Sequence, residues 1–167
     1  MNCKALPHSA LLFILTVLWG CQQQQPEIRL EKTAPVSGSE LIATMEANVD
    51  SFYAAYERFD NSWLDFFEEE FTNAFPDTPI RSTSKNSTKA LWEGIYSRYD
   101  VQLIARGKPS FIASNDMVIS HNAFHEIFIS KASGDTTNVA GTYVLAWRRQ
   151  PDKTWKIAFE SVLNSES

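Results

Sequence analysis

Two histidines have the side-chain type best suited to moving protons near neutral pH. His121 and His125 lie in a segment rich in β-branched and aromatic residues, which predicts a strand over residues 117–130. Because a strand rises by about 3.3 Å per residue, four residues separate the two imidazoles by about 13 Å, and they cannot share one metal ion. A single histidine inside a cavity could still act as a base. The alternative to a catalytic role is a histidine that is hydrogen-bonded within the fold or exposed on the surface.

The alternation of this strand leaves open which face points inward. One face carries both histidines, and the other carries polar and aromatic residues: Ser120, Asn122, Phe124, Glu126 and Phe128. The carboxylates Glu93, Glu126 and Glu160 are scattered with no spacing that specifies a pair. Phosphate-binding loops, a nucleophile elbow and a cysteine nucleophile are missing from the sequence, so we expect no cofactor and no metal.

Three helical segments precede the strands. Apolar residues at steps of three or four predict an amphipathic helix over residues 40–60: Leu41, Met45, Val49, Phe52, Tyr56 and Phe59. A second, shorter helix is expected over residues 62–70. Residues 71–84, with two prolines, indicate a short hairpin or an irregular arm. Ser87 can cap a third helix that reaches Tyr99.

Beyond Asp100 the chain becomes rich in strand-forming residues. Turn residues divide it into five runs, at 101–105, 110–114, 117–130, 138–149 and 154–163. Helices followed by consecutive hairpins indicate an α+β fold, with three N-terminal helices packed on a bent antiparallel β-sheet.

The N-terminus resembles a bacterial lipoprotein signal. Lys4 precedes an apolar run over residues 10–18, which is too short to span a bilayer, and Gly20 and Cys21 follow. The resemblance implies a signal peptide over residues 1–20 and a lipid on Cys21, which would anchor the protein to the cell envelope on the extracytoplasmic side. Gln22 after the acylated cysteine suggests the outer membrane if the cell has one. An ordinary secretory signal with an incidental cysteine is the alternative.

The rest of the chain forms a polar tether over residues 21–39 and one domain over residues 40–163. Only two cysteines occur, Cys3 in the signal and Cys21, so the domain has no disulfide and is held by packing. The aromatic share of 13% suggests a lined cavity or simply an aromatic core. The net charge of −5 and the lack of a basic cluster argue against a nucleic-acid partner.

The C-terminal residues resemble a known superfamily. The resemblance is carried by two C-terminal runs, Gly141 to Arg149 and Trp155 to Ala158, and by the predicted helical segments at residues 52–56 and 89–92. These residues look like those of the nuclear transport factor 2-like (NTF2-like) proteins, in the ketosteroid isomerase homologue branch (SnoaL-like, DUF4440). The resemblance implies a cone of three helices and a strongly bent sheet around an apolar pocket. It also implies a sheet whose outer face often forms a homodimer. One such fold hosts isomerases, cyclases, dehydratases and binding proteins, so the reaction does not follow.

Steroid-isomerising members of this superfamily use a tyrosine, a second acid and a carboxylate base. Hand alignment places these roles on Phe52, near Leu145 and on Phe75, none of which carries a proton. Tyr56, one turn beyond Phe52, is the better polar residue for the pocket, with a purely structural core tyrosine as the alternative.

Three functional hypotheses follow. The leading one is a non-catalytic domain that binds a small, largely apolar molecule or a partner. Its expected binding residues are Phe52, Tyr56, Phe75, Trp92 and Trp147. The second is an isomerase, cyclase or dehydratase that uses His121 or His125 with Tyr56. The third is an interaction module whose sheet pairs with a second copy or with another envelope protein.

Overall fold

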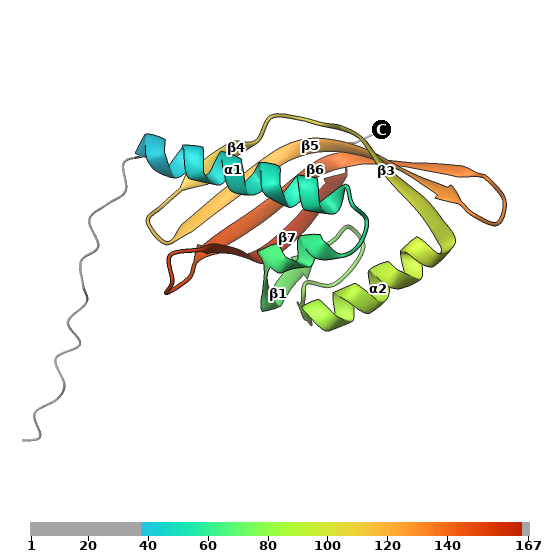
Figure 1. Ribbon diagram of the computed structural model, residues 1–167, viewed down its shortest axis with the longest axis horizontal. Coiled ribbons are helices and arrows are strands. Elements are labelled where there is room, and N and C mark those ends of the chain that lie inside the picture. Colours follow the sequence, from blue (N-terminus) through green and yellow to red (C-terminus); the bar gives the residue numbers. More distant parts are fainter. Residues whose placement is uncertain (1–37, 165–167) are drawn as a thin grey trace, which may run out of the picture. The chain divides into compact units, whose positions relative to one another are not determined.

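The computed structural model describes residues 38–164. The predicted signal peptide, the lipid attachment at Cys21 and nearly all of the predicted tether lie outside these residues. The described part contains two α-helices, one short 3-10 helix and seven strands (Figure 1). In chain order they are α1 Gly38–Tyr56, η1 Ser62–Phe66, β1 Phe67–Ala74, β2 Arg81–Ser84, α2 Lys85–Arg98, β3 Tyr99–Arg106, β4 Ser110–Ala113, β5 Met117–Ser130, β6 Thr136–Arg149 and β7 Trp155–Asn164.

The seven strands form one sheet that is mixed, where we predicted an antiparallel one. The strand order is β2-β1-β7-β6-β5-β3, and β4 pairs with β5 on the edge that β3 also uses. All neighbours are antiparallel except β1 and β7, which run parallel. β1 lies outside the consecutive C-terminal hairpins on which the antiparallel prediction rested, and it pairs with β7 in the same direction. The predicted α+β class is confirmed.

The first helix is confirmed, with its end four residues earlier than predicted. Its apolar stripe is buried against the sheet, from Leu41 to Tyr56. Phe59 and Asn61 then adopt left-handed backbone angles, with φ of 52° and 67°, and these angles cannot continue a right-handed helix. The helix begins at Gly38, inside the segment that we assigned to the tether.

The predicted helix over residues 62–70 is wrong. Only Ser62–Phe66 is helical, as a single 3-10 segment, and Phe67–Ala74 forms β1. Phe67 and Phe71 are buried while Glu69 and Glu70 are exposed. The pairing of β1 with both β2 and β7 therefore overrides the helical preference of the acidic run. Within residues 38–164 the fold thus has two α-helices rather than three.

Residues 71–84 form a hairpin, which was one of the two alternatives predicted for this segment, the other being an irregular arm. Asn73 pairs with Arg81 and Glu70 with Ser84 across the turn. The helix that follows begins at Lys85 rather than after Ser87, because Ser84 is its N-cap and accepts a hydrogen bond from the backbone N–H of Ser87. None of the helices between residues 38 and 164 is long and apolar enough to cross a bilayer.

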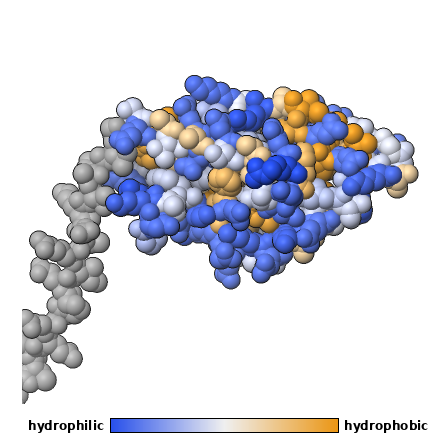
Figure 2. Space-filling view, viewed as in Figure 1, coloured by the Kyte–Doolittle hydropathy of each residue, from blue (hydrophilic) through white to orange (hydrophobic). Residues whose placement is uncertain are grey.

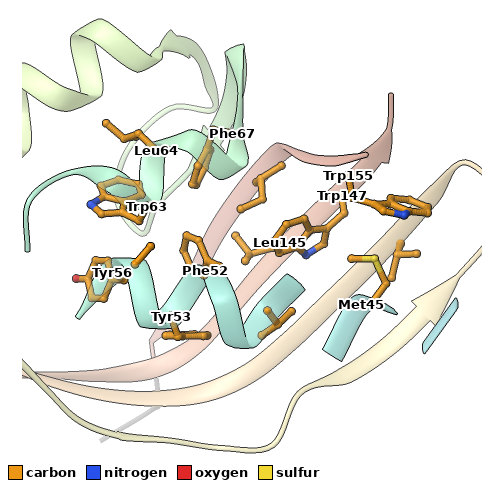
Figure 3. Packing of buried hydrophobic residues seen from close by; sticks show 14 of the residues in the cluster. Met45, Phe52, Tyr53, Tyr56, Trp63, Leu64, Phe67, Leu145, Trp147 and Trp155 are labelled. Carbon is orange, nitrogen blue, oxygen red and sulfur yellow. The ribbon is translucent and has the colours of Figure 1, made fainter. Parts of the chain in front are cut away.

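The core lies between α1, η1 and the concave face of the sheet (Figure 3). Phe52 is at its centre and is surrounded by aromatic rings, from Tyr53 at 5.2 Å to Tyr56 at 6.5 Å between ring centroids. The surface in Figure 2 is largely hydrophilic, with a few groups of hydrophobic residues. Ile104 and Ile112 are among the exposed hydrophobic residues of the described chain.

Candidate functional site

A cavity of about 90 Å³ lies between the helices and the inner face of the sheet. Its wall comes from α1, η1, α2 and strands β5, β6 and β7, with Phe75 contributed from the end of β1. The lining residues are Phe52, Tyr53, Tyr56, Trp63, Phe75, Trp92, Phe124, Glu126, Tyr143, Glu160 and Val162. Most of these residues are aromatic, so the cavity offers an apolar wall with a few polar groups, which is the usual composition of a small-molecule site.

Four of the five predicted binding residues line this cavity: Phe52, Tyr56, Phe75 and Trp92. Trp147 is fully buried elsewhere in the core, and its indole Nε1 donates a hydrogen bond of 2.9 Å to Ser120 Oγ. Phe52 and Phe75 also show that the aligned acid–base positions carry phenyl rings in the cavity wall.

The two histidines do not reach the cavity. The even-numbered residues of β5, from Val118 to Glu126, are buried, so the odd-numbered residues face outward. His125 Nε2 lies 3.1 Å from Asn138 Oδ1 on that outer face, and His121 lies opposite Val144 in the β5–β6 register. The open question of which face points inward is thereby answered, and it places Asn122 and Glu126 inside.

Two carboxyl groups enter the cavity from strands on either side of β6. Glu126 on β5 is 9% exposed and Glu160 on β7 is 4% exposed. Their spacing in the sequence did not indicate that these two residues lie in one site, because they are 34 positions apart in the numbering. They share the cavity only because β5 and β7 pair with opposite edges of β6. One sequence feature could have indicated this site, namely the position of Glu160 within the largely apolar segment from Ile157 to Val162. A carboxylate in such a strand is seldom buried without a function.

Glu160 is paired with a phenol. Tyr143 Oη donates a hydrogen bond to Glu160 Oε2, with 2.5 Å between the two oxygens. Burial raises the pKa of the Glu160 carboxyl to about 7, and the hydrogen bond from Tyr143 opposes this rise. Burial and the Glu160 charge raise the pKa of Tyr143 well above its ordinary value, so the tyrosine keeps its proton.

Glu126 is paired with a second phenol, that of Tyr56. Burial raises the pKa of Glu126 to about 7, and a hydrogen bond with Tyr56 lowers it. The pKa of Tyr56 is raised well above its ordinary value, first by burial and then by the charge of Glu126. The cavity therefore holds two carboxyl–phenol pairs. One of them contains Tyr56, which we had named as a catalytic candidate, and neither contains a histidine.

A third phenol, Tyr53, is held differently. Asn122 Nδ2 donates to Tyr53 Oη at 2.8 Å and also to the backbone carbonyl of Ala123 at 3.1 Å. A carbonyl oxygen only accepts, so the amide atom beside it must be the nitrogen and the Tyr53 oxygen is an acceptor. Arg106 covers the ring with its guanidinium 4.8 Å from the centroid and pairs with Asp50. No acceptor for the Tyr53 hydroxyl hydrogen is found among residues 38–164.

These groups can perform general acid–base chemistry near neutral pH. A carboxyl group with a pKa of about 7 is present in both protonation states at pH 7, so it can give or take a proton. Tyr53 lines the same cavity and has a hydrogen available for an acceptor. Within the described residues no group of three histidine, cysteine or acidic side chains could hold a metal ion.

Comparisons by sequence find no match, either to a protein-family model or to a curated protein. Solved structures do match. A nuclear transport factor 2-like superfamily protein from Salmonella enterica serovar Typhimurium is 12% identical with a TM-score of 0.61, over 75% of this chain and 94% of that one. A ketosteroid isomerase-like protein from Erwinia carotovora atroseptica is 16% identical with a TM-score of 0.59, over 77% and 98%.

A third similar structure is a hexachlorocyclohexane dehydrochlorinase, LinA-type3, from Novosphingobium barchaimii. It is 11% identical with a TM-score of 0.62, over 75% of this chain and 89% of that one. At these identities the likeness shows the fold and not the reaction. The curled seven-stranded sheet, the covering helices and these structural matches together establish that the chain has the NTF2-like fold.

Proposed function

We propose that the cavity carries out acid–base chemistry, without a cofactor, on a small and largely apolar substrate. The observation that carries this proposal is the presence of two buried carboxyl groups, Glu126 and Glu160, each beside a tyrosine phenol in one aromatic cavity. This observation replaces the argument from vacant acid positions, which had favoured a role in binding alone.

Two proton-carrying groups in one cavity suit an isomerisation or an elimination. One carboxylate removes a proton from a carbon atom of the substrate, and the other carboxylic acid delivers a proton to a second position or to a leaving oxygen. The Tyr53 hydroxyl can donate to an oxygen on which negative charge develops. The similar structures include one protein named ketosteroid isomerase-like and one named a dehydrochlorinase, and these names refer to an isomerisation and an elimination.

Hydrogen–deuterium exchange tests this proposal without knowledge of the natural substrate. Cyclohexanone in D₂O exchanges its α-hydrogens slowly, and NMR follows the exchange. We expect the full chain to accelerate it, and Glu126→Gln or Glu160→Gln to reduce the acceleration about 100-fold or more. Glu93→Gln is the matched control, since Glu93 lies on α2 in an exposed pair with Lys89. Equal acceleration by all four proteins would contradict the proposal.

Binding without catalysis is the second candidate. Its support is the aromatic wall, with phenyl rings of Phe52 and Phe75 at positions where isomerases carry acids. Mass spectrometry of small molecules retained by natively purified protein would identify a ligand. A retained ligand that the protein leaves unchanged, together with no exchange activity, would favour this candidate over the first.

We also propose that the domain is held at the cell envelope by a lipid on Cys21. The support is the signal-like N-terminus, and a Cys21→Ser variant should lose the lipid mass and leave the membrane fraction. Pairing with a second copy through the outer sheet face is a further proposal. It is supported by the row Ile112, Ile119 and Ala146, which lie opposite one another across β4, β5 and β6. A sedimentation coefficient independent of concentration and equal to that of a monomer would rule the pairing out.

A further inference from the structure

The wall of the cavity combines two acidic side chains with aromatic rings and contains no basic side chain. Glu126 and Glu160 are its acidic members, and none of the described residues that line it is a lysine, an arginine or a histidine. Arg106 lies over the ring of Tyr53, but it pairs with the exposed Asp50 and does not line the cavity. The described chain therefore places no positive charge in the cavity to balance the two carboxyl groups.

The protein satisfies these carboxyl groups only in part. An ionised carboxyl group that is taken out of water is costly unless a positive charge or several hydrogen bonds compensate it. Among residues 38–164, Glu160 accepts a hydrogen bond from Tyr143, and Glu126 hydrogen-bonds with Tyr56. The two oxygens of a carboxylate together can accept about four hydrogen bonds. Most of the capacity of both groups is therefore left for a ligand.

The unsatisfied oxygen of Glu160 is open to the cavity. The bond from Tyr143 goes to Oε2, and no partner for Oε1 is found in the described chain. The polar atoms that are both sealed from water and unpartnered belong to Asn61, Trp63 and Tyr96, and not to either glutamate. Since Glu160 is only 4% exposed and lines the cavity, the space that its free oxygen meets is the cavity itself.

Aromatic rings lie next to both carboxyl groups. Tyr143 stacks on Phe52 with 6.2 Å between the ring centroids, and Tyr56 packs against Trp92 at 5.9 Å. All four of these rings line the cavity. The face of an aromatic ring attracts a cation, and sites built from several rings are used to bind quaternary ammonium groups.

We infer that the cavity binds a small organic cation, with its positive nitrogen beside the carboxyl groups of Glu126 and Glu160 and its carbon atoms against the aromatic rings. A methylated ammonium group suits this wall, because it carries a charge for the carboxylates and presents apolar surface to the rings. The cavity of about 90 Å³ has room for roughly six to nine non-hydrogen atoms, at about 10 to 15 Å³ for each water-sized group. Choline is within this size.

This inference deepens the proposed function by naming the class of substrate, and it rests on the ligand occupying the same cavity. Its test measures binding and not turnover. Choline and 3,3-dimethyl-1-butanol have nearly the same shape, and they differ in that a positive nitrogen replaces a neutral carbon atom. Calorimetric titration of the full chain with each compound therefore isolates the effect of the charge.

At pH 8 we expect choline to bind at least about tenfold more tightly than the neutral alcohol. Glu160→Gln and Glu126→Gln keep the shape of the wall and remove a charge, so each should reduce this preference about fivefold or more. The affinity for the alcohol should stay within about threefold in both variants, which shows that they are folded. Glu93→Gln, at the exposed position on α2, should keep the full preference.

The preference should also depend on pH, although the charge of choline does not. Burial raises the pKa of both glutamates to about 7, so lowering the pH from 8 to 5.5 should neutralise them and weaken choline binding at least about tenfold. Arg106 stays ionised throughout. Burial also raises the pKa of the phenols around the two carboxyl groups, which keeps them neutral: Tyr53, Tyr56, Tyr96 and Tyr143.

The protein with both glutamates changed to glutamine should lose this pH dependence. The two histidines lie on the outer face of β5, and a dependence that survives in the double variant would assign it to them or to another group and would contradict the inference. Affinity for the alcohol should change little with pH in every protein. The wild-type comparison of pH 8 with pH 5.5 stands even if a glutamine variant does not fold.

Equal affinity for choline and the alcohol at pH 8 would overturn the inference. So would failure of both to bind, or an undiminished preference in both glutamine variants. The outcome is separable from that of the exchange experiment. A choline preference without exchange activity leaves the cation site standing and removes the catalytic proposal, whereas exchange activity without the preference does the reverse.

Discussion

Tyr143 Oη donates a hydrogen bond to Glu160 Oε2 across the β6–β7 pair, deep in the concave side of the sheet. Tyr143 is opposite Val162 in the register, and Glu160 is opposite Leu145, so the two side chains meet on the diagonal of neighbouring strands. This pair shows how an antiparallel meander places a buried carboxyl beside a phenol, although the two residues lie in different runs of the sequence.

The free energy of unfolding should fall as the pH rises from about 5 to about 7. Glu126 and Glu160 have pKa values of about 7 when folded, against 4.5 for the ordinary side chain. Between these values the unfolded chain releases protons that the folded chain keeps, so rising pH favours unfolding. Each carboxyl contributes on the order of 2 to 3 kcal/mol to this loss.

Urea unfolding at several pH values measures this dependence. The Glu126→Gln and Glu160→Gln proteins should each lose about half of it, because the amide does not titrate. Glu93→Gln, at an exposed position, should retain all of it. Stability that rises over this range in the wild-type protein would be incompatible with two buried carboxyl groups.

Removing the Tyr143 hydroxyl should raise the pKa of Glu160 further. The hydrogen bond from Tyr143 lowers that pKa, so Tyr143→Phe leaves burial unopposed. The carboxyl carbon of Glu160, followed by NMR, should then titrate above pH 7. Tyr99→Phe is the matched control, since Tyr99 lies on β3 against Phe128 and does not line the cavity. An unchanged or lower titration midpoint in Tyr143→Phe would contradict the assigned pairing.

Truncating Phe52 should destabilise the fold strongly. The ring is 1% exposed at the centre of the aromatic cluster, and Phe52→Ala leaves a cavity that the surrounding rings cannot fill. We expect a loss of about 3 to 5 kcal/mol in the free energy of unfolding. Ile80→Ala, at a residue that is 72% exposed, should change stability by less than about 0.5 kcal/mol. Similar losses for the two variants would show that Phe52 is not at the centre of the core.

Trp147 should matter for stability and not for ligand binding. Trp147→Phe removes the buried donor to Ser120 Oγ and leaves that hydroxyl without its partner, at a cost of about 1 to 3 kcal/mol. The affinity for a small aromatic probe such as phenol should stay within about twofold, since Trp147 does not line the cavity. Trp92→Phe, which changes the cavity wall, should alter the affinity while costing less stability. A large change in affinity for Trp147→Phe would contradict the observed position of this side chain.

Local patterns predicted most of the elements. The apolar stripe from Leu41 to Tyr56 predicted α1, and the long β-rich runs predicted β5, β6 and β7. The acidic run Glu68 to Glu70 led to the wrong prediction of a helix over residues 62–70. Its helical preference is weaker than the two strand pairings that β1 makes. The parallel pairing of β1 with β7 joins residues far apart in the chain, and no local pattern encodes it.

The site was harder to predict because it depends on which face of β5 points inward. The alternation of residues in β5 showed two faces, one with the histidines and one with Asn122 and Glu126. It could not tell which face points inward, since both faces mix polar and apolar residues. The aromatic wall was predictable, because Phe52 and Tyr56 follow the helical stripe that must be buried. The meeting of Glu126 with Glu160 depends on the order of three strands, and only the folded sheet shows it.

The most direct test of the central claim is an NMR titration of the carboxyl carbons of Glu126 and Glu160, assigned with the two glutamine variants. Our account predicts that both carboxyl groups titrate near pH 7, because both are buried in the same aromatic cavity. Titration of both near pH 4.5, as for carboxyl groups in water, would contradict it.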